Sequence, residues 1–161
     1  MKTIVEKFLN DTHDDDDVPE YKILEDQSVD IMKSFYPMGN IAILPFQINE
    51  VHGNANLDCN QLQSLKNGPR VVHGYFNCSG NKLKSLQFCP KFVEGNLDCN
   101  SNPIEPWEHR YLLFSEIQGR IKTGNSELNL FFRKYKNQKH LIPQALKELR
   151  EIQIRCEQKN A

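Results

Sequence analysis

Residues 51–65 read VHGNANLDCNQLQSL, and two variants follow: residues 72–86 read VHGYFNCSGNKLKSL, and residues 93–107 read VEGNLDCNSNPIEPW. Each copy begins 21 residues after the one before. A fixed period of this length is typical of a solenoid, in which each unit is a short supersecondary turn that buries its apolar side only against its neighbours. The repeat therefore predicts an α/β solenoid for the middle of the chain.

The first half of each unit alternates between apolar and polar residues. In the middle unit, Val72, Phe76 and Cys78 occupy alternate positions, with Gly74 between the first two. A period of two is that of a β-strand, so this half is predicted to be a strand with its apolar side inward. The glycine leaves an inward position without a side chain, which indicates close approach of the neighbouring backbone. The other units carry this glycine at Gly53 and Gly95.

An asparagine ends the predicted strand of every unit, at Asn60, Asn81 and Asn102. Asparagine tolerates turn geometry, and its side-chain amide can bond free backbone groups. One asparagine per coil can therefore form a ladder along the solenoid.

These units resemble leucine-rich repeats, whose pattern is L-x-L-x-x-N-x-L. The matching residues are Ala55, Leu57, Asn60 and Leu62, then Phe76, Cys78, Asn81 and Leu83, then Leu97, Cys99, Asn102 and Ile104. The chain departs from the family at its leading leucine, where it has His52, His73 and Glu94. The resemblance implies a parallel sheet that lines a concave face, and protein binding as the usual role.

The V-x-G…C-x-x-N-x-L…C-P form of the units is similar to short repeat proteins encoded by bacteriophages, which often end in an NPI-x-x-W unit and a helical tail. This chain has NPIEPW at residues 102–107. The similarity implies a host-directed role, such as binding and blocking a bacterial enzyme or defence component. The protein would then act in the host cytoplasm.

Three regions are expected along the chain: an acidic N-terminal arm or cap (residues 1–37), the solenoid (38–107) and a C-terminal helical domain (108–161). The first ten residues, MKTIVEKFLN, have the spacing of a short amphipathic helix, although a strand fits as well. The run from Asp14 to Asp17 is too charged to bury and predicts an exposed loop.

Residues 39–50, GNIAILPFQINE, are interpreted as a degraded repeat unit. A shift by 21 positions places Ile41 on Leu62 and Leu44 on Leu65. The solenoid is therefore expected to begin there, with its strand half altered.

After Trp107 the apolar spacing becomes that of helices. One helix is expected from Pro106, a second after Ser126, and a third with Pro143 in its first turn. Their apolar stripes are Trp107, Tyr111, Phe114, Ile117 and Ile121; then Leu128, Phe131, Phe132 and Tyr135; then Ile142, Ala145, Leu146, Leu149, Ile152 and Cys156.

The net charge of −1 conceals opposite charges at the two ends of the chain. Residues 1–30 carry ten acids and three bases, whereas residues 120–161 carry ten bases and four acids. The two ends either pair internally or leave a basic surface for an acidic partner. The alternative function is therefore nucleic-acid binding by the C-terminal helices, through Arg133, Lys134, Lys136, Lys139, Lys147 and Arg150.

The outward strand positions form polar rows across the units, because the register is constant. Solenoids usually bind their partners on such a face. The candidate partner-binding residues, in rows, are His52, His73 and Glu94; Asn54, Tyr75 and Asn96; Asn56, Asn77 and Asp98; and Asp58.

No catalytic motif stands out, so the chain is interpreted as a non-enzymatic interaction protein without a cofactor. The row of His52, His73 and Glu94 has metal-ligating side chains, but parallel positions stand side by side rather than around an ion, and no metal is predicted.

The five cysteines of the chain include no C-x-x-C pair and are expected to be buried free thiols. No apolar run at the N-terminus resembles a secretory or membrane-spanning segment, which favours a cytoplasmic location.

Overall fold

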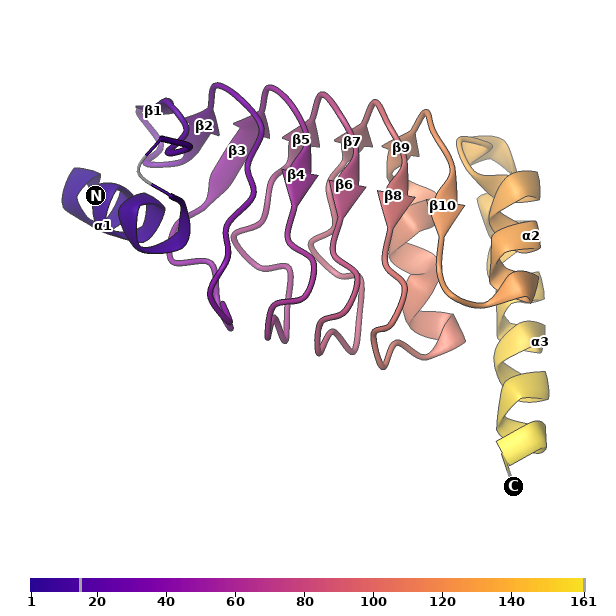
Figure 1. Ribbon diagram of the computed structural model, residues 1–161. Coiled ribbons are helices and arrows are strands. Elements are labelled where there is room, and N and C mark those ends of the chain that lie inside the picture. The colour runs from indigo at the N-terminus through magenta and orange to yellow at the C-terminus, as the bar shows by residue number, and fades with distance from the viewer. Residues whose placement is uncertain (15, 161) are drawn as a thin grey trace.

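The computed structural model describes residues 1–14 and 16–160, which form an α/β solenoid with helices at both ends (Figure 1). The coils stack side by side and contribute to two sheets, of order β1-β2-β3-β5-β7-β9 and β10-β8-β6-β4. All strand pairs are parallel except β1 with β2. The strands are β1 (Tyr21–Ile23), β2 (Val29–Ile31), β3 (Ile48–Val51), β4 (Ala55–Asn56), β5 (Val71–Val72), β6 (Phe76–Asn77), β7 (Phe92–Val93), β8 (Leu97–Asp98), β9 (Glu116–Ile117) and β10 (Ile121–Lys122).

The register confirms the repeat of 21 residues. Val51 pairs with Val72 and Val72 with Val93 in the six-stranded sheet, while Ala55 pairs with Phe76 in the four-stranded sheet. The prediction of one continuous strand per unit is wrong, because the backbone bends between Val51 and Ala55. Figure 1 shows each coil turning from one sheet to the other at its upper edge. Side chains still alternate through this corner, so the period of two cannot distinguish it from a straight strand.

The corner glycines lie against the neighbouring coil, as predicted. A Cβ atom on Gly74 would stand 2.8 Å from the carbonyl oxygen of Gly53, and one on Gly95 would stand 2.8 Å from the backbone nitrogen of Tyr75. These are distances that real Cβ atoms do not tolerate, so the corners can stack at the spacing of the sheets only with glycine.

The asparagine ladder is also confirmed. The side-chain oxygen of Asn81 accepts the N–H of Leu62 at 2.9 Å, and its nitrogen donates to the carbonyl oxygens of Leu57 (2.8 Å) and Cys78 (3.1 Å). Asn60 and Asn102 repeat this arrangement one coil earlier and one coil later. Each asparagine thus satisfies buried backbone groups of two coils at once.

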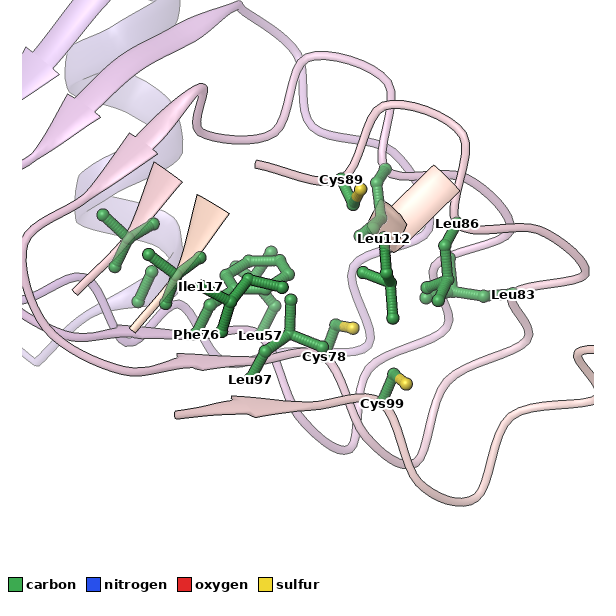
Figure 2. Packing of buried hydrophobic residues seen from close by; sticks show 14 of the residues in the cluster. Leu57, Phe76, Cys78, Leu83, Leu86, Cys89, Leu97, Cys99, Leu112 and Ile117 are labelled. Carbon is green, nitrogen blue, oxygen red and sulfur yellow. The ribbon is translucent and has the colours of Figure 1, made fainter. Parts of the chain in front are cut away.

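The core runs through the solenoid between the two sheets and the turns that follow the asparagines. Figure 2 shows Phe76 and Leu97, from paired strands, together with Leu57 and the thiols Cys78 and Cys99 inside the coils. Cys78, Cys89 and Cys99 are buried free thiols, as expected, but Cys59 is exposed and Cys156 is only half-buried. The sequence expectation failed there because Cys59 sits in the turn at a positive φ of 52°, past the inward strand positions.

The N-terminal segment caps the first coil as a helix, α1 (Lys2–Thr12), which decides between the helix and the strand. Its Val5 and Leu9 are buried, and Phe8 meets Phe46 edge to face at 5.5 Å between ring centroids. Asp14, Asp16 and Asp17 are exposed, and Asp15 lies outside the described residues.

The degraded unit belongs to this first coil. The N–H of Ile41 donates to the side chain of Asn60, as that of Leu62 does to Asn81, so Ile41 and Leu62 are equivalent. Its strand half is β2, which lies before residue 39, and Ile31 pairs with Val51 at an offset of 20 residues instead of 21.

The helix expected between Pro106 and Ile121 is wrong beyond Phe114. A 3-10 helix, η1 (Pro106–Phe114), is followed by β9 and β10, which extend the solenoid past residue 107. Ile117 and Ile121 match the helical spacing, but they also occupy the inward strand positions of one more coil. Pairing with β7 and β8 gives the backbone of these residues a ladder, and this tertiary contact overrides the local pattern.

Helices close the other end of the solenoid: α2 (Ser126–Tyr135), η2 (Lys139–Leu141) and α3 (Ile142–Asn160). The N-cap of α2 is Asn125, one residue before the expected Ser126, and its side chain accepts the N–H groups of Glu127 and Leu128. The predicted stripe of α2 is buried. None of the described helices is long and apolar enough to cross a membrane.

Candidate binding surface

The outer side of the four-stranded sheet carries most of the predicted partner-binding residues. We call this surface the sheet face: Asn54, Tyr75, Asn96 and Arg120; Tyr36, Asn56, Asn77, Asp98 and Lys122; and Asp58, Ser79 and Asn100. The first predicted row, His52, His73 and Glu94, lies instead at the corners between the two sheets. The residues of the sheet face line up because β4, β6 and β8 pair in a constant register.

Two asparagines of the sheet face bond the backbone of the next coil. The side-chain oxygen of Asn54 accepts the N–H of Tyr75 at 3.0 Å, and that of Asn96 accepts the N–H of Arg120 at 2.8 Å. These side chains therefore help to hold the coils together, in addition to lining the surface.

The central row fixes the ends of its strands. Asn77 accepts the N–H of Ser79 at 3.0 Å, and Asp98 accepts the N–H of Asn100 at 3.1 Å. The ammonium group of Lys122 lies 3.6 Å from the other oxygen of Asp98. The face is thus polar, and its backbone geometry is tightly determined.

Tyr36 and Tyr75 are the large aromatic side chains on this face, with 41% and 36% of their surface exposed. The side-chain nitrogen of Asn54 donates to the Tyr36 hydroxyl at 3.1 Å. A hydrogen bond with Ser34 lowers the pKa of Tyr36, whereas desolvation raises the pKa of Tyr75. Sequence reasoning missed Tyr36 for two reasons. Ile31 precedes its partner Val51 by 20 residues instead of 21, and the corner of the first coil has no glycine to mark it.

A pocket of about 540 Å³ adjoins Tyr36 at the acidic end of the sheet face. The Nε2 atom of His13 is buried without a hydrogen-bond partner, and burial lowers the pKa of this histidine. The lining residues are His13, Asp14, Asp17, Pro19, Lys33, Ser34, Tyr36 and Met38.

The other end of the face is basic. Arg120 and Lys122 were missed with the last coil, although the spacing of Ile117, Gly119 and Ile121 repeats V-x-G-x-L and could have revealed it. Figure 1 shows the two ends of the chain at opposite ends of the solenoid. Among the described residues no ion pair joins residues 1–30 to residues 120–161, so internal neutralisation of the two ends is ruled out there.

The two corner histidines come together, but Glu94 is not with them. The rings of His52 and His73 stack at 5.3 Å between centroids and at 20°. The carboxylate beside them is Glu50, whose Oε2 lies 3.1 Å from Nε2 of His73 and 3.9 Å from Nε2 of His52. Sequence reasoning missed Glu50, because it lies just before Val51, the first residue of the repeat unit.

Three of the six residues of the predicted basic surface have partners within the chain. Lys134 pairs with Glu148 at 2.8 Å, and the guanidinium of Arg150 lies 4.6 Å from the ring centroid of Trp107. Lys136 donates to backbone carbonyls at the end of the solenoid. The remaining residues, Arg133, Lys139 and Lys147, are exposed.

Comparison of the chain with protein-family models, curated proteins and solved structures finds no match. The function must therefore be inferred from the side chains of this chain and from how the solenoid presents them. Three features have side chains suited to binding: the sheet face, the adjoining pocket, and the cluster of Glu50, His52 and His73.

Proposed function

We propose that the protein is a non-enzymatic protein-binding module that engages its partner through the sheet face, with Tyr36 and Tyr75 as anchors. The observation that carries the proposal is the exposure of two tyrosines on a face whose other residues are small and polar, apart from Arg120 and Lys122 at its basic end. Tyrosine is enriched at binding hot spots, since it buries a large ring and keeps a hydroxyl for hydrogen bonding. Small polar side chains around it supply adaptable hydrogen bonds.

Rigidity supports the same proposal. The Asn54 side chain bonds the backbone of Tyr75 and the hydroxyl of Tyr36, so one residue orients both anchors. A surface held in its binding conformation loses less conformational entropy on association than a flexible loop does.

The partner would extend beyond the sheet face. Strands lie about 4.8 Å apart, so the strip from the first to the last coil covers roughly 20 by 20 Å. A standard interface takes about 800 Å² from each partner. The pocket beside Tyr36, with Asp14 and Asp17 at its rim, is the adjoining surface that we include in the interface.

The proposed partner is a protein of a bacterial host, which the chain would bind and block in the host cytoplasm. This step rests on the resemblance of the repeat units to those of phage-encoded repeat proteins. Nucleic-acid binding by the C-terminal helices has less support, because Lys134, Lys136 and Arg150 already have partners within the chain.

Affinity capture from bacterial lysate, read by mass spectrometry, tests the proposal. Tyr36→Ala with Tyr75→Ala should reduce the yield of the captured protein by about 10-fold or more, as expected for hot-spot tyrosines. The matched control is Leu130→Ala, which truncates an exposed apolar side chain on α2. Equal capture by both variants would exclude this face. Capture of nucleic acid that disappears with added salt would support the alternative instead.

A further inference from the structure

We propose that Glu50, His52 and His73 form a binding site for a divalent transition-metal ion, with zinc as the representative ion. One ligand atom from each of the three side chains lies within 4.8 Å of the other two. Two imidazole nitrogens and a carboxylate oxygen form a donor set that zinc accepts in proteins. This site is independent of the sheet face and of the proposed protein partner.

The distances suit an ion with small movements of the side chains. Zinc lies about 2.0–2.2 Å from nitrogen and oxygen ligands, so the ligand atoms of a tetrahedral site are separated by roughly 3.3 Å. Glu50 Oε2 lies 3.1 Å from His73 Nε2 and 3.9 Å from His52 Nε2. The side chains of Glu50, His52 and His73 are 34%, 39% and 40% exposed, so they can rotate into place and the ion can reach them.

The repeat itself creates the histidine pair. Val51 pairs with Val72, so the residues that follow them, His52 and His73, stand at equivalent corners of neighbouring coils. Two such ligands alone would stand side by side without enclosing an ion. Glu50 removes this difficulty, because its side chain extends from β3 toward both Nε2 atoms. Its Oε2 atom and the two Nε2 atoms are then three ligand atoms that can lie around one ion.

Among the residues that the structure describes, such a cluster occurs at one place along the solenoid. Glu50 is paired with Val71, and Val71 with Phe92, so the next two coils have apolar residues where β3 has its carboxylate. The ring of Phe92 lies 6.4 Å from that of His73 and borders the site on that side. A fourth position for water or another donor remains open toward solvent, as in three-ligand zinc sites.

Zinc titration of the purified chain, free of any affinity tag, tests the site by competition with a chromophoric chelator. One ion should bind per chain, and Glu50→Gln, His52→Ala and His73→Ala should each weaken binding about 10-fold or more, since even changes to residues behind the ligands have effects of this size. Binding should also weaken at acid pH, because protons compete with the metal for imidazole. With Co²⁺ in place of zinc, the visible absorption spectrum should report nitrogen and oxygen coordination without sulfur.

Glu94→Gln and His140→Ala are the matched controls, since both residues are exposed and neither belongs to the cluster. They should bind zinc as the unchanged chain does. Because all five substitutions are at exposed or half-exposed positions, folding can be verified by circular dichroism. The proposal is overturned if the unchanged chain does not bind zinc at millimolar concentration, if the three ligand variants bind it normally, or if only Cys59→Ser abolishes binding.

Discussion

The side-chain nitrogen of Asn81 donates to the backbone carbonyl of Leu57, in the preceding coil, at 2.8 Å. The same side chain accepts the N–H of Leu62, so its loss leaves buried backbone groups without partners. Asn81→Ala should therefore lower the free energy of unfolding by about 3 kcal/mol. Urea denaturation measures the change. Asn77→Ala, which removes one bond to Ser79, should cost only about 1 kcal/mol; equal losses would contradict the ladder.

Gly74→Ala should destabilise the solenoid at a corner. The added Cβ would stand 2.8 Å from the carbonyl oxygen of Gly53 and 2.9 Å from the backbone nitrogen of Asn54, both rigid groups. Overcrowding of this kind costs about 1–3 kcal/mol. The midpoint of thermal unfolding should fall accordingly, whereas the exposed Gln63→Ala should leave it nearly unchanged. A normal midpoint for Gly74→Ala would mean that the coils can separate at this corner.

Stability should fall as the pH drops below about 6.5, because imidazoles of the unfolded chain take up protons. Burial lowers the pKa of His109 below its ordinary value of 6.5, so the unfolded chain binds the proton first. The stabilisation is fully present above pH 6.5 and is lost as the pH falls toward the lowered pKa of the folded state. Urea midpoints at several pH values measure the loss. His109→Leu should reduce this pH dependence, and the exposed His140→Leu should not.

His13 has a pKa lowered by burial as well, so part of the dependence should remain in His109→Leu. The double variant with His13→Leu should depend on pH less than His109→Leu alone. A dependence that is unchanged in the double variant would assign it to other groups.

Cys59 should react much faster with a thiol reagent than the buried cysteines. Its side chain is exposed, whereas burial raises the pKa of Cys78 and Cys99 and leaves little thiolate to react. In native protein Cys59 should react fastest and the half-buried Cys156 next, while denatured protein should show all five cysteines. Mass spectrometry of the labelled peptides identifies the site; fast labelling of Cys78 would mean that the coils open readily.

Loss of the two side chains that cover the edge of β9, Lys136 and Asn137, should cause self-association. Lys136 donates to the carbonyl oxygens of Ile117 and Gln118, and Asn137 bonds both backbone groups of Ile117. An uncovered strand edge is a template for pairing with another chain. Lys136→Ala with Asn137→Gly should therefore sediment as larger species as concentration rises. Lys139→Ala, which removes an exposed charge nearby, should stay like the unchanged chain.

The interior of the solenoid was largely predictable from the sequence. Val51, Val72 and Val93 recur at a fixed interval, and a constant interval determines which residues meet across the coils. The hydrogen bonds of the asparagines were predictable too, because a polar residue that recurs beside buried positions needs a backbone partner. The first and last coils were not predictable in the same way. Ile31 and Val51 are 20 residues apart and Val93 and Ile117 are 24 apart, so neither coil keeps the interval of 21 residues.

Local periodicity is enough to predict the stacking unit, its inward residues and the roles of the glycines and asparagines. Contacts between distant residues are needed to place the bends of the strands, to continue a sheet at Ile117, and to bring Glu50 rather than Glu94 beside the two histidines. The physical reason is that a period of two describes which side of the backbone a residue occupies. It does not describe how the backbone turns, and the turn is set by contact with the neighbouring coil.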